Sequence, residues 1–199
     1  MSADPSVSGI VLAGGSARRF GADKLTVELR GRPLLHHAML ALAEACDELV
    51  VTVAAGAAPP LLPVDLAIPL VVVHDATADA GPLAGLAAGL ECARGSVALV
   101  VAGDQPDLRP ALLRTLRGAL GTAAAAILAD GLMPRSLPAA LRREPALAAA
   151  RVALGSADRS LLGLIVGLEP VIVPEAAWRA VDPHGDWRRD VDRPEDLPG

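Results

Sequence analysis

The chain has 199 residues and a formal net charge of −5 at neutral pH, and 52% of its residues are hydrophobic. This length fits one sizeable α/β domain, residues 1–199, and is short for two. The negative charge and the absence of a basic run argue against a nucleic-acid partner, which needs a positive surface. No uncharged apolar run reaches the roughly 20 residues that cross a bilayer, so we expect no membrane partner.

The N-terminus and the cysteines indicate a cytoplasmic location. Residues 1–8 have no basic flank followed by the apolar core of a signal peptide. Cys46 and Cys92 are isolated thiols without the spacing of a metal site, which fits a reducing compartment.

Aromatic residues make up only 2% of the chain, so its core must be built from aliphatic side chains. Such cores suit parallel strands that are buried on both faces and read as unbroken apolar runs. Runs of this kind predict six strands, at Val7 to Ala13, Glu48 to Val53, Leu70 to His74, Val97 to Ala102, Ala125 to Leu128 and Val171 to Pro174.

Apolar residues at helical spacing predict helices between these strands. The three segments are Pro33 to Cys46, Pro82 to Ala93 and Arg109 to Leu120. This alternation predicts a mostly parallel sheet with right-handed crossovers, whose ligands bind beyond the carboxyl ends of the strands. Element boundaries are least well defined by the sequence from Asp130 to Gly167.

A glycine-rich loop with two basic residues follows the first predicted strand. Residues 12–24 read LAGGSARRFGADK. Gly14 and Gly15 let backbone N–H groups approach a phosphate closely, and Arg19 and Lys24 add positive charge for a triphosphate. This is not a Walker loop, because no Gly-Lys-Ser/Thr closes it. The alternative interpretation is a surface turn with solvated basic residues.

Acidic residues follow two of the later strands. Asp75 precedes the run Gly81 to Gly85, and a carboxylate there suits a guanine edge or a ribose diol. Its alternative role is a helix cap, and we interpret the adjacent His74 as an ordinary histidine at the edge of the core.

Asp104 ends an apolar strand, where a carboxylate needs a neutralising partner. Mg²⁺ provides one, since it prefers one or two carboxylates with phosphate oxygens and water.

A second acidic motif lies near the C-terminus. Asp190 and Asp192 alternate in an extended segment, so both side chains can face the same point. We therefore expect Asp192 as a second metal ligand, while Asp190 either joins it or belongs to a solvated acidic tail.

Together these motifs resemble the sugar-nucleotidyltransferase-like superfamily and, within it, the molybdenum cofactor guanylyltransferase family, which joins GMP from GTP to molybdopterin. The resemblance covers almost the full length and is most specific from Gly9 to Leu35 and at the two acidic motifs. It implies a Rossmann-like three-layer sandwich of the nucleotide-diphospho-sugar transferase type with a mostly parallel sheet. The double glycine of LAGG resembles the guanylyl branch, whereas the cytidylyl branch more often carries LAAG.

The resemblance also implies roles for individual residues. Leu12, Ala13 and Gly14 would hold the base and ribose, and Gly15, Arg19 and Lys24 would face the phosphates. Asp75 and Gly81 would contact the nucleoside, and Asp104 would bind both the nucleotide and Mg²⁺. Two departures limit these implications. Residues 131–138 lack the histidine of the family's acceptor stretch, and aspartates replace the family's asparagines at 190 and 192, as in related cytidylyltransferases.

The implied reaction needs no nucleophilic side chain. An acceptor phosphate attacks the α-phosphorus of GTP in line, and Lys24 and Arg19 stabilise the leaving pyrophosphate. Asp104, with Asp192, holds the metal. The rival functions are cytidylyl transfer to molybdopterin, nucleotidyl transfer to a phospholactate or sugar-phosphate acceptor, and non-catalytic nucleotide binding. A dehydrogenase is disfavoured because the loop lacks Gly-x-Gly-x-x-Gly and no acid ends the second strand.

Overall fold

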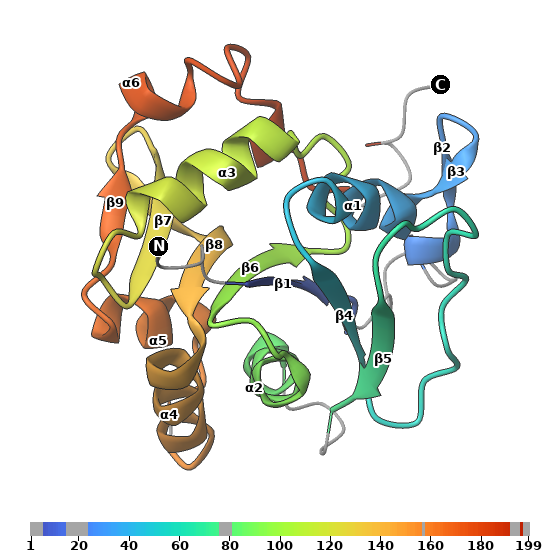
Figure 1. Ribbon diagram of the computed structural model, residues 1–199, viewed down its shortest axis with the longest axis horizontal. Helices are drawn as coiled ribbons and strands as arrows, with labels where there is room; N and C mark the ends of the chain where they lie inside the picture. The colour runs from blue at the N-terminus through green and yellow to red at the C-terminus, as the bar shows by residue number, and fades with distance from the viewer. Residues whose placement is uncertain (1–5, 15–23, 76–80, 157, 192–195, 197–199) are drawn as a thin grey trace.

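A computed structural model describes residues 6–14, 24–75, 81–156, 158–191 and 196. At its centre is a seven-stranded sheet with the order β5-β4-β1-β6-β8-β7-β9 (Figure 1). The strands are β1 (Val7–Leu12), β4 (Glu48–Val53), β5 (Leu70–His74), β6 (Val97–Ala102), β7 (Ala125–Asp130), β8 (Met133–Arg142) and β9 (Val171–Val173). All neighbours pair in parallel except β8, which is antiparallel to both β6 and β7. The predicted mostly parallel sheet is confirmed.

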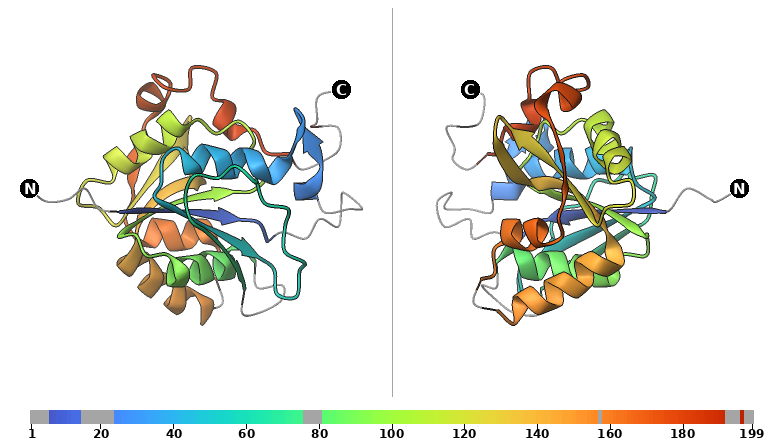
Figure 2. Two further views of the ribbon diagram at one scale, coloured as in Figure 1. Left: turned by 45° about the vertical axis from the view of Figure 1, so that its right-hand side comes forward. Right: turned by 90° about the vertical axis from the view of Figure 1, so that its left-hand side faces the viewer.

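Helices cover both faces of the sheet (Figures 1 and 2). On one face lie α1 (Leu34–Ala43), α3 (Pro110–Ala119) and α6 (Glu175–Trp178), and on the other lie α2 (Pro82–Cys92), α4 (Arg143–Leu154) and α5 (Leu161–Gly167). The strand residues alternate between the two cores. In β1, for example, Val11 packs into one core and Ile10 into the other. The expected three-layer sandwich is therefore present.

The structure differs from the sequence-based expectation mainly in the second half. The sequence predicted neither the long strand β8 nor the helices α4 and α5 with definite boundaries. Strand β8 carries Pro134 and Pro138, residues that usually argue against a strand interior. The β7–β8 pairing accommodates them with a register shift between Ile127 and Ala129, because a bulge tolerates a missing backbone donor.

A small hairpin precedes α1. Strands β2 (Glu28–Leu29) and β3 (Arg32–Pro33) are antiparallel, and their two-residue turn places Arg30 at φ 53° and Gly31 at φ 76°. Two positive φ angles match the twist of a tight hairpin. The short 3-10 turns are η1 (Lys24–Thr26) and η2 (Asp186–Arg188). Among the residues with assigned structure, no helix is both long and apolar enough to cross a membrane.

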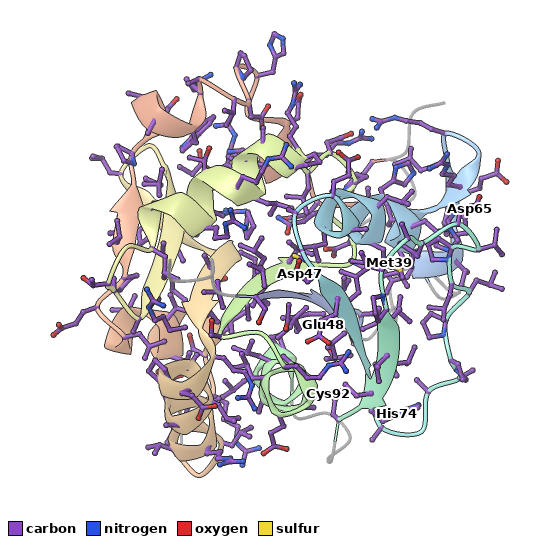
Figure 3. The ribbon with its side chains drawn as sticks, viewed as in Figure 1. Met39, Asp47, Glu48, Asp65, His74 and Cys92 are labelled. Carbon is purple, nitrogen blue, oxygen red and sulfur yellow. The ribbon has the colours of Figure 1, made fainter. Side chains whose placement is uncertain are left out.

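A buried polar network ties the strands together at the amino ends of β1 and β4. Glu48, which is labelled in Figure 3, accepts hydrogen bonds from Ser8 Oγ (2.6 Å), from the Arg94 backbone N–H (2.7 Å) and from Arg94 Nε (2.7 Å). Burial raises the pKa of the Glu48 carboxyl, but the hydrogen bonds from Ser8 and Arg94 outweigh it and hold the pKa below its ordinary value of 4.5. The charged carboxylate is therefore the form that stabilises the fold.

We expect Glu48→Ala to lower the free energy of unfolding by about 2–4 kcal/mol, since it leaves buried donors without a charged acceptor. Urea denaturation at pH 7 measures the loss. A depressed folded pKa gives stability that is present above 4.5 and lost as the pH falls through the folded value, so the difference from wild type should shrink in acid.

Glu91→Ala is the matched control, because Glu91 forms an exposed ion pair with Arg151 at 2.9 Å. Such pairs contribute about 0–1 kcal/mol. Equal losses in the two variants would contradict a structural role for the Glu48 network.

Candidate active site

The four parallel strands β1, β4, β5 and β6 bring their carboxyl ends to one edge of the sheet. The hydrogen-bond ladder continues one residue past the strands at this edge. Ala13 donates its N–H to the Thr52 carbonyl (2.8 Å), and Gly103 donates to the Leu12 carbonyl (3.0 Å). The backbone that follows β1 and the backbone that follows β6 are therefore held side by side.

Glycines allow close packing at this edge. A Cβ on Gly14 would lie 3.3 Å from the backbone nitrogen of Ala54, and a Cβ on Gly103 would lie 3.0 Å from Leu35 Cδ1. Gly81, which precedes α2, has a φ of 75°, a conformation that L side chains rarely adopt. The start of α2 therefore depends on a glycine at this position.

Lys24 and Asp104 meet directly at this edge. Lys24 Nζ, at the start of η1, donates a 2.6 Å hydrogen bond to Asp104 Oδ2 in the loop after β6. The two side chains are only 17% and 19% exposed. In the structure, an ammonium group thus neutralises this carboxylate. Lys24 is also the only lysine in the sequence, where seventeen arginines supply the other basic side chains.

The C-terminal segment is attached to the same loop. Val191 is fully buried and donates its backbone N–H to the Asp104 carbonyl (3.1 Å). Asp107 accepts hydrogen bonds from Arg30 Nη1 (2.6 Å) and Arg189 Nη1 (3.0 Å). Burial raises the pKa of Asp107, but these two guanidinium groups outweigh it and hold the pKa below the ordinary value. The carboxylate therefore bridges the β2–β3 hairpin and the C-terminal segment.

A cleft of about 810 Å³ adjoins Asp104. Its walls come from the loop after β6, the tip of the β7–β8 hairpin, α5, α6 and the segment from η2 to Asp190. The charged side chains that line it are Asp104, Asp130, Arg135, Glu175, Arg188 and Asp190. The volume suits a small molecule.

The structure shows what Gln105 does in the loop after β6, and it adds Arg188, which the sequence did not indicate. Gln105 accepts a hydrogen bond from the Ala102 N–H (3.1 Å) and donates to the Trp187 carbonyl (3.3 Å), and so fixes the loop that carries Asp104. Arg188 Nη1 donates to Asp130 Oδ1 (2.9 Å). One cleft residue, Arg135, could have been noticed from the sequence, because it lies in the stretch 131–138 that departs from the family pattern.

Asp75 lies at the end of β5 with 9% of its surface exposed. Its Oδ1 has no hydrogen-bond partner in the part of the chain that the structure describes. Burial raises the pKa of this carboxyl, while its own backbone N–H and His74 lower it to a smaller degree. His74, expected at the edge of the core, is exposed and places Nε2 3.1 Å from the Ala57 carbonyl (Figure 3). An unpaired buried carboxylate oxygen is a ready acceptor for a ligand donor.

Three expected site residues, Gly15, Arg19 and Asp192, lie outside the described residues. Within the described ranges, no group of three His, Cys, Asp or Glu side chains could hold a metal ion. Asp104 still fits Mg²⁺, because this ion is commonly held by one or two carboxylates together with substrate phosphates and water.

Comparison with known proteins gives a consistent result. A family model described as the MobA-like NTP transferase domain matches residues 9–179. The chain is 33% identical to a probable molybdenum cofactor guanylyltransferase of Chloroflexus aggregans, over 96% of this chain and 91% of that protein.

Two solved structures share the fold. Molybdopterin-guanine dinucleotide biosynthesis protein A from Archaeoglobus fulgidus superposes with a TM-score of 0.74 and 22% identity, covering 96% of this chain and 94% of that one. The 4-diphosphocytidyl-2C-methyl-D-erythritol synthase of Anaerococcus prevotii superposes with a TM-score of 0.70 and 15% identity, with the same coverage of both chains.

We expect Asp75→Asn to raise the free energy of unfolding at pH 7 by about 1–3 kcal/mol, because it removes the charge of a buried group with an unpaired oxygen. A raised folded pKa means that the destabilisation appears as the pH rises above the ordinary value of 3.8. Urea denaturation at pH 7 and near pH 4 should therefore show a larger gain at pH 7.

Asp65→Asn serves as the control, since Asp65 is exposed (Figure 3), and its effect should stay within about 0.5 kcal/mol. A loss of stability in Asp75→Asn at pH 7 would show that the carboxylate has a partner and that its burial is not a cost.

Proposed function

Because the chain belongs to the MobA-like NTP transferase family, we propose that it transfers GMP from GTP to molybdopterin and releases pyrophosphate. As a member of that family it is a nucleotidyltransferase. The observation that carries the proposal is the contact between Lys24 and Asp104 at the wall of a cleft of about 810 Å³. A cation for phosphates and a carboxylate for a metal thus come together beside space for an acceptor. We take residues 1–199 as one domain that acts in the cytoplasm.

We propose that the nucleotide lies across the carboxyl ends of β1, β4 and β5. Leu12, Ala13 and Gly14 would hold the base and ribose, and Gly14 provides the close approach to the chain after β4. Asp75, with its unpaired oxygen, would accept hydrogen bonds from the nucleoside near Gly81. Gly15, Arg19 and Lys24 would bind the triphosphate. This arrangement follows the rule that ligands of parallel sheets bind beyond the carboxyl ends of the strands.

In the proposed reaction an oxygen of the acceptor phosphate bonds to the α-phosphorus, and the bond from that phosphorus to the β-phosphate oxygen breaks. Lys24 leaves Asp104 to bind the phosphate tail, and with Arg19 it stabilises the negative charge that develops on pyrophosphate. Asp104, with Asp192, would hold Mg²⁺. Such an ion acts as a Lewis acid on phosphate oxygens. The remaining contribution of the chain is to position two anions that repel each other.

A cytidylyltransferase is the second candidate, since Asp190 and Asp192 resemble the acidic pair of that branch. Thermal shift with each nucleoside triphosphate and Mg²⁺ distinguishes the two. At equal concentrations, the nucleotide that binds most tightly raises the melting temperature most, and a ligand at 100 times its Kd stabilises a protein by about 2.7 kcal/mol. If the proposal holds, GTP should give the largest shift. A subsequent assay should detect pyrophosphate when molybdopterin is added. A larger shift with CTP would favour the alternative, and no pyrophosphate with any nucleotide would exclude an active transferase.

We expect Asp104→Ala to lower kcat for GMP transfer by about 10²-fold or more, as when an enzyme loses one transition-state electrostatic contact. Circular dichroism should show an unchanged fold, because the loop is still held through its backbone and Gln105. Near-normal turnover of this variant at saturating Mg²⁺ would refute the metal assignment.

Lys24→Ala should weaken GTP binding by about 10–100-fold, because it removes a charge-assisted hydrogen bond. Such a bond contributes about 1.5–3 kcal/mol. GMP binding should change much less, because GMP lacks the β- and γ-phosphates. Titration calorimetry measures both constants. Since Lys24 is the only lysine, an amine-selective reagent followed by mass spectrometry also reports on it directly, and GTP should protect it. Equal losses of affinity for GTP and GMP would rule out that Lys24 binds the β- and γ-phosphates.

A further inference from the structure

The cleft beside Asp104 has more acidic than basic side chains, yet the proposed acceptor is an anion. Three of these acids, Asp104, Asp130 and Glu175, accept hydrogen bonds from cationic side chains. Lys24 binds Asp104 at 2.6 Å, Arg188 binds Asp130 at 2.9 Å, and Arg179 binds Glu175 at 2.5 Å. These acids therefore present little net negative charge to a ligand.

Arg135, unlike these cations, has no hydrogen-bonded partner among the described residues. Its Nη2 lies 3.7 Å from Asp190 Oδ2, which is beyond hydrogen-bond distance, and its side chain is 44% exposed. Within the described residues its guanidinium donates no hydrogen bond. The five N–H donors of a guanidinium form a rigid fork that matches a phosphate. Arg135 is thus the cation of the cleft that has donors available for an anionic ligand.

The backbone places Arg135 close to the reacting groups. It faces Asp190, whose neighbour Val191 donates its backbone N–H to the Asp104 carbonyl at 3.1 Å. Arg135 also lies near the start of β8, next to the hairpin tip that forms one wall of the cleft. The guanidinium therefore lies in the same cleft that Asp104 lines.

We infer that Arg135 binds the phosphate of the acceptor and restricts the enzyme to acceptors that carry a phosphomonoester. This inference rests on the proposed function and adds the residue that recognises the second substrate. A dianionic nucleophile approaching a triphosphate needs a cation on its own side, and a bidentate guanidinium supplies both charge and orientation.

The first test compares Arg135→Met with Arg151→Met. Arg151 is an exposed α4 residue paired with Glu91, so its variant loses the same charge far from the cleft. Arg135→Met should raise the KM for molybdopterin by about 10–100-fold, as for the loss of a charged hydrogen bond, and leave the KM for GTP within about threefold. Arg135→Lys should fall between, because an ammonium keeps the charge and loses the fork. Matching KM values for Arg135→Met and Arg151→Met would overturn the assignment.

The second test measures binding without turnover. Molybdopterin and molybdopterin treated with alkaline phosphatase are titrated into wild type and Arg135→Met, with thermal midpoints recorded to confirm folding. Wild type should prefer the phosphorylated form by about tenfold or more, and the variant should lose that preference. A preference kept by the variant would contradict the role of Arg135.

The two proposals fail separately. If wild type transfers GMP and the variant retains its acceptor KM, only the assignment of Arg135 is wrong. If wild type transfers no GMP but shows the phosphate preference in binding, and Arg135→Met loses that preference, the proposed function is wrong and the phosphate-binding role of Arg135 stands.

Discussion

The ion pair between Lys24 and Asp104 is the contact on which the proposed chemistry depends. It joins two positions that are 80 residues apart, and it forms because β1 and β6 are adjacent and parallel, so that the segments after both strands reach the same edge. The pair also satisfies two charges that would otherwise be costly at their low exposure. In the proposed reaction, binding of the nucleotide and Mg²⁺ would replace this contact and give each of the two side chains a new partner.

The position of β6 in the sheet would let Asp104 serve both of the proposed substrates. On one side β6 pairs in parallel with β1, and on the other it pairs antiparallel with β8. The parallel half ends in the glycine loop, Asp75 and the start of α2, whereas the antiparallel half carries the hairpin and the cleft. Asp104 follows the strand at this boundary. In the proposed reaction, Asp104 would therefore lie between the nucleotide and the acceptor.

Much of the parallel half of the sheet could be predicted from the sequence, because unbroken aliphatic runs identify parallel strands whose carboxyl ends share one edge. Asp75 and Asp104 were chosen as candidates in this way, and the structure places both of them directly after strands at that edge. The cleft half could not, since Pro134 and Pro138 obscure β8, and the neighbours of Arg135 come from segments distant in the chain. The burial of Asp75, with one oxygen unpaired among the residues that the structure describes, depends on packing that no local pattern records.

The single lysine has a practical consequence. Apart from the α-amino group, Lys24 Nζ is the only primary amine in the chain. Coupling the protein to an activated carboxyl surface, or labelling it with an amine-directed dye, would direct the chemistry to the N-terminus and to the group that we assign to the triphosphate. Immobilised preparations would then appear inactive for a reason unrelated to folding. Attachment through an added tag avoids this artefact.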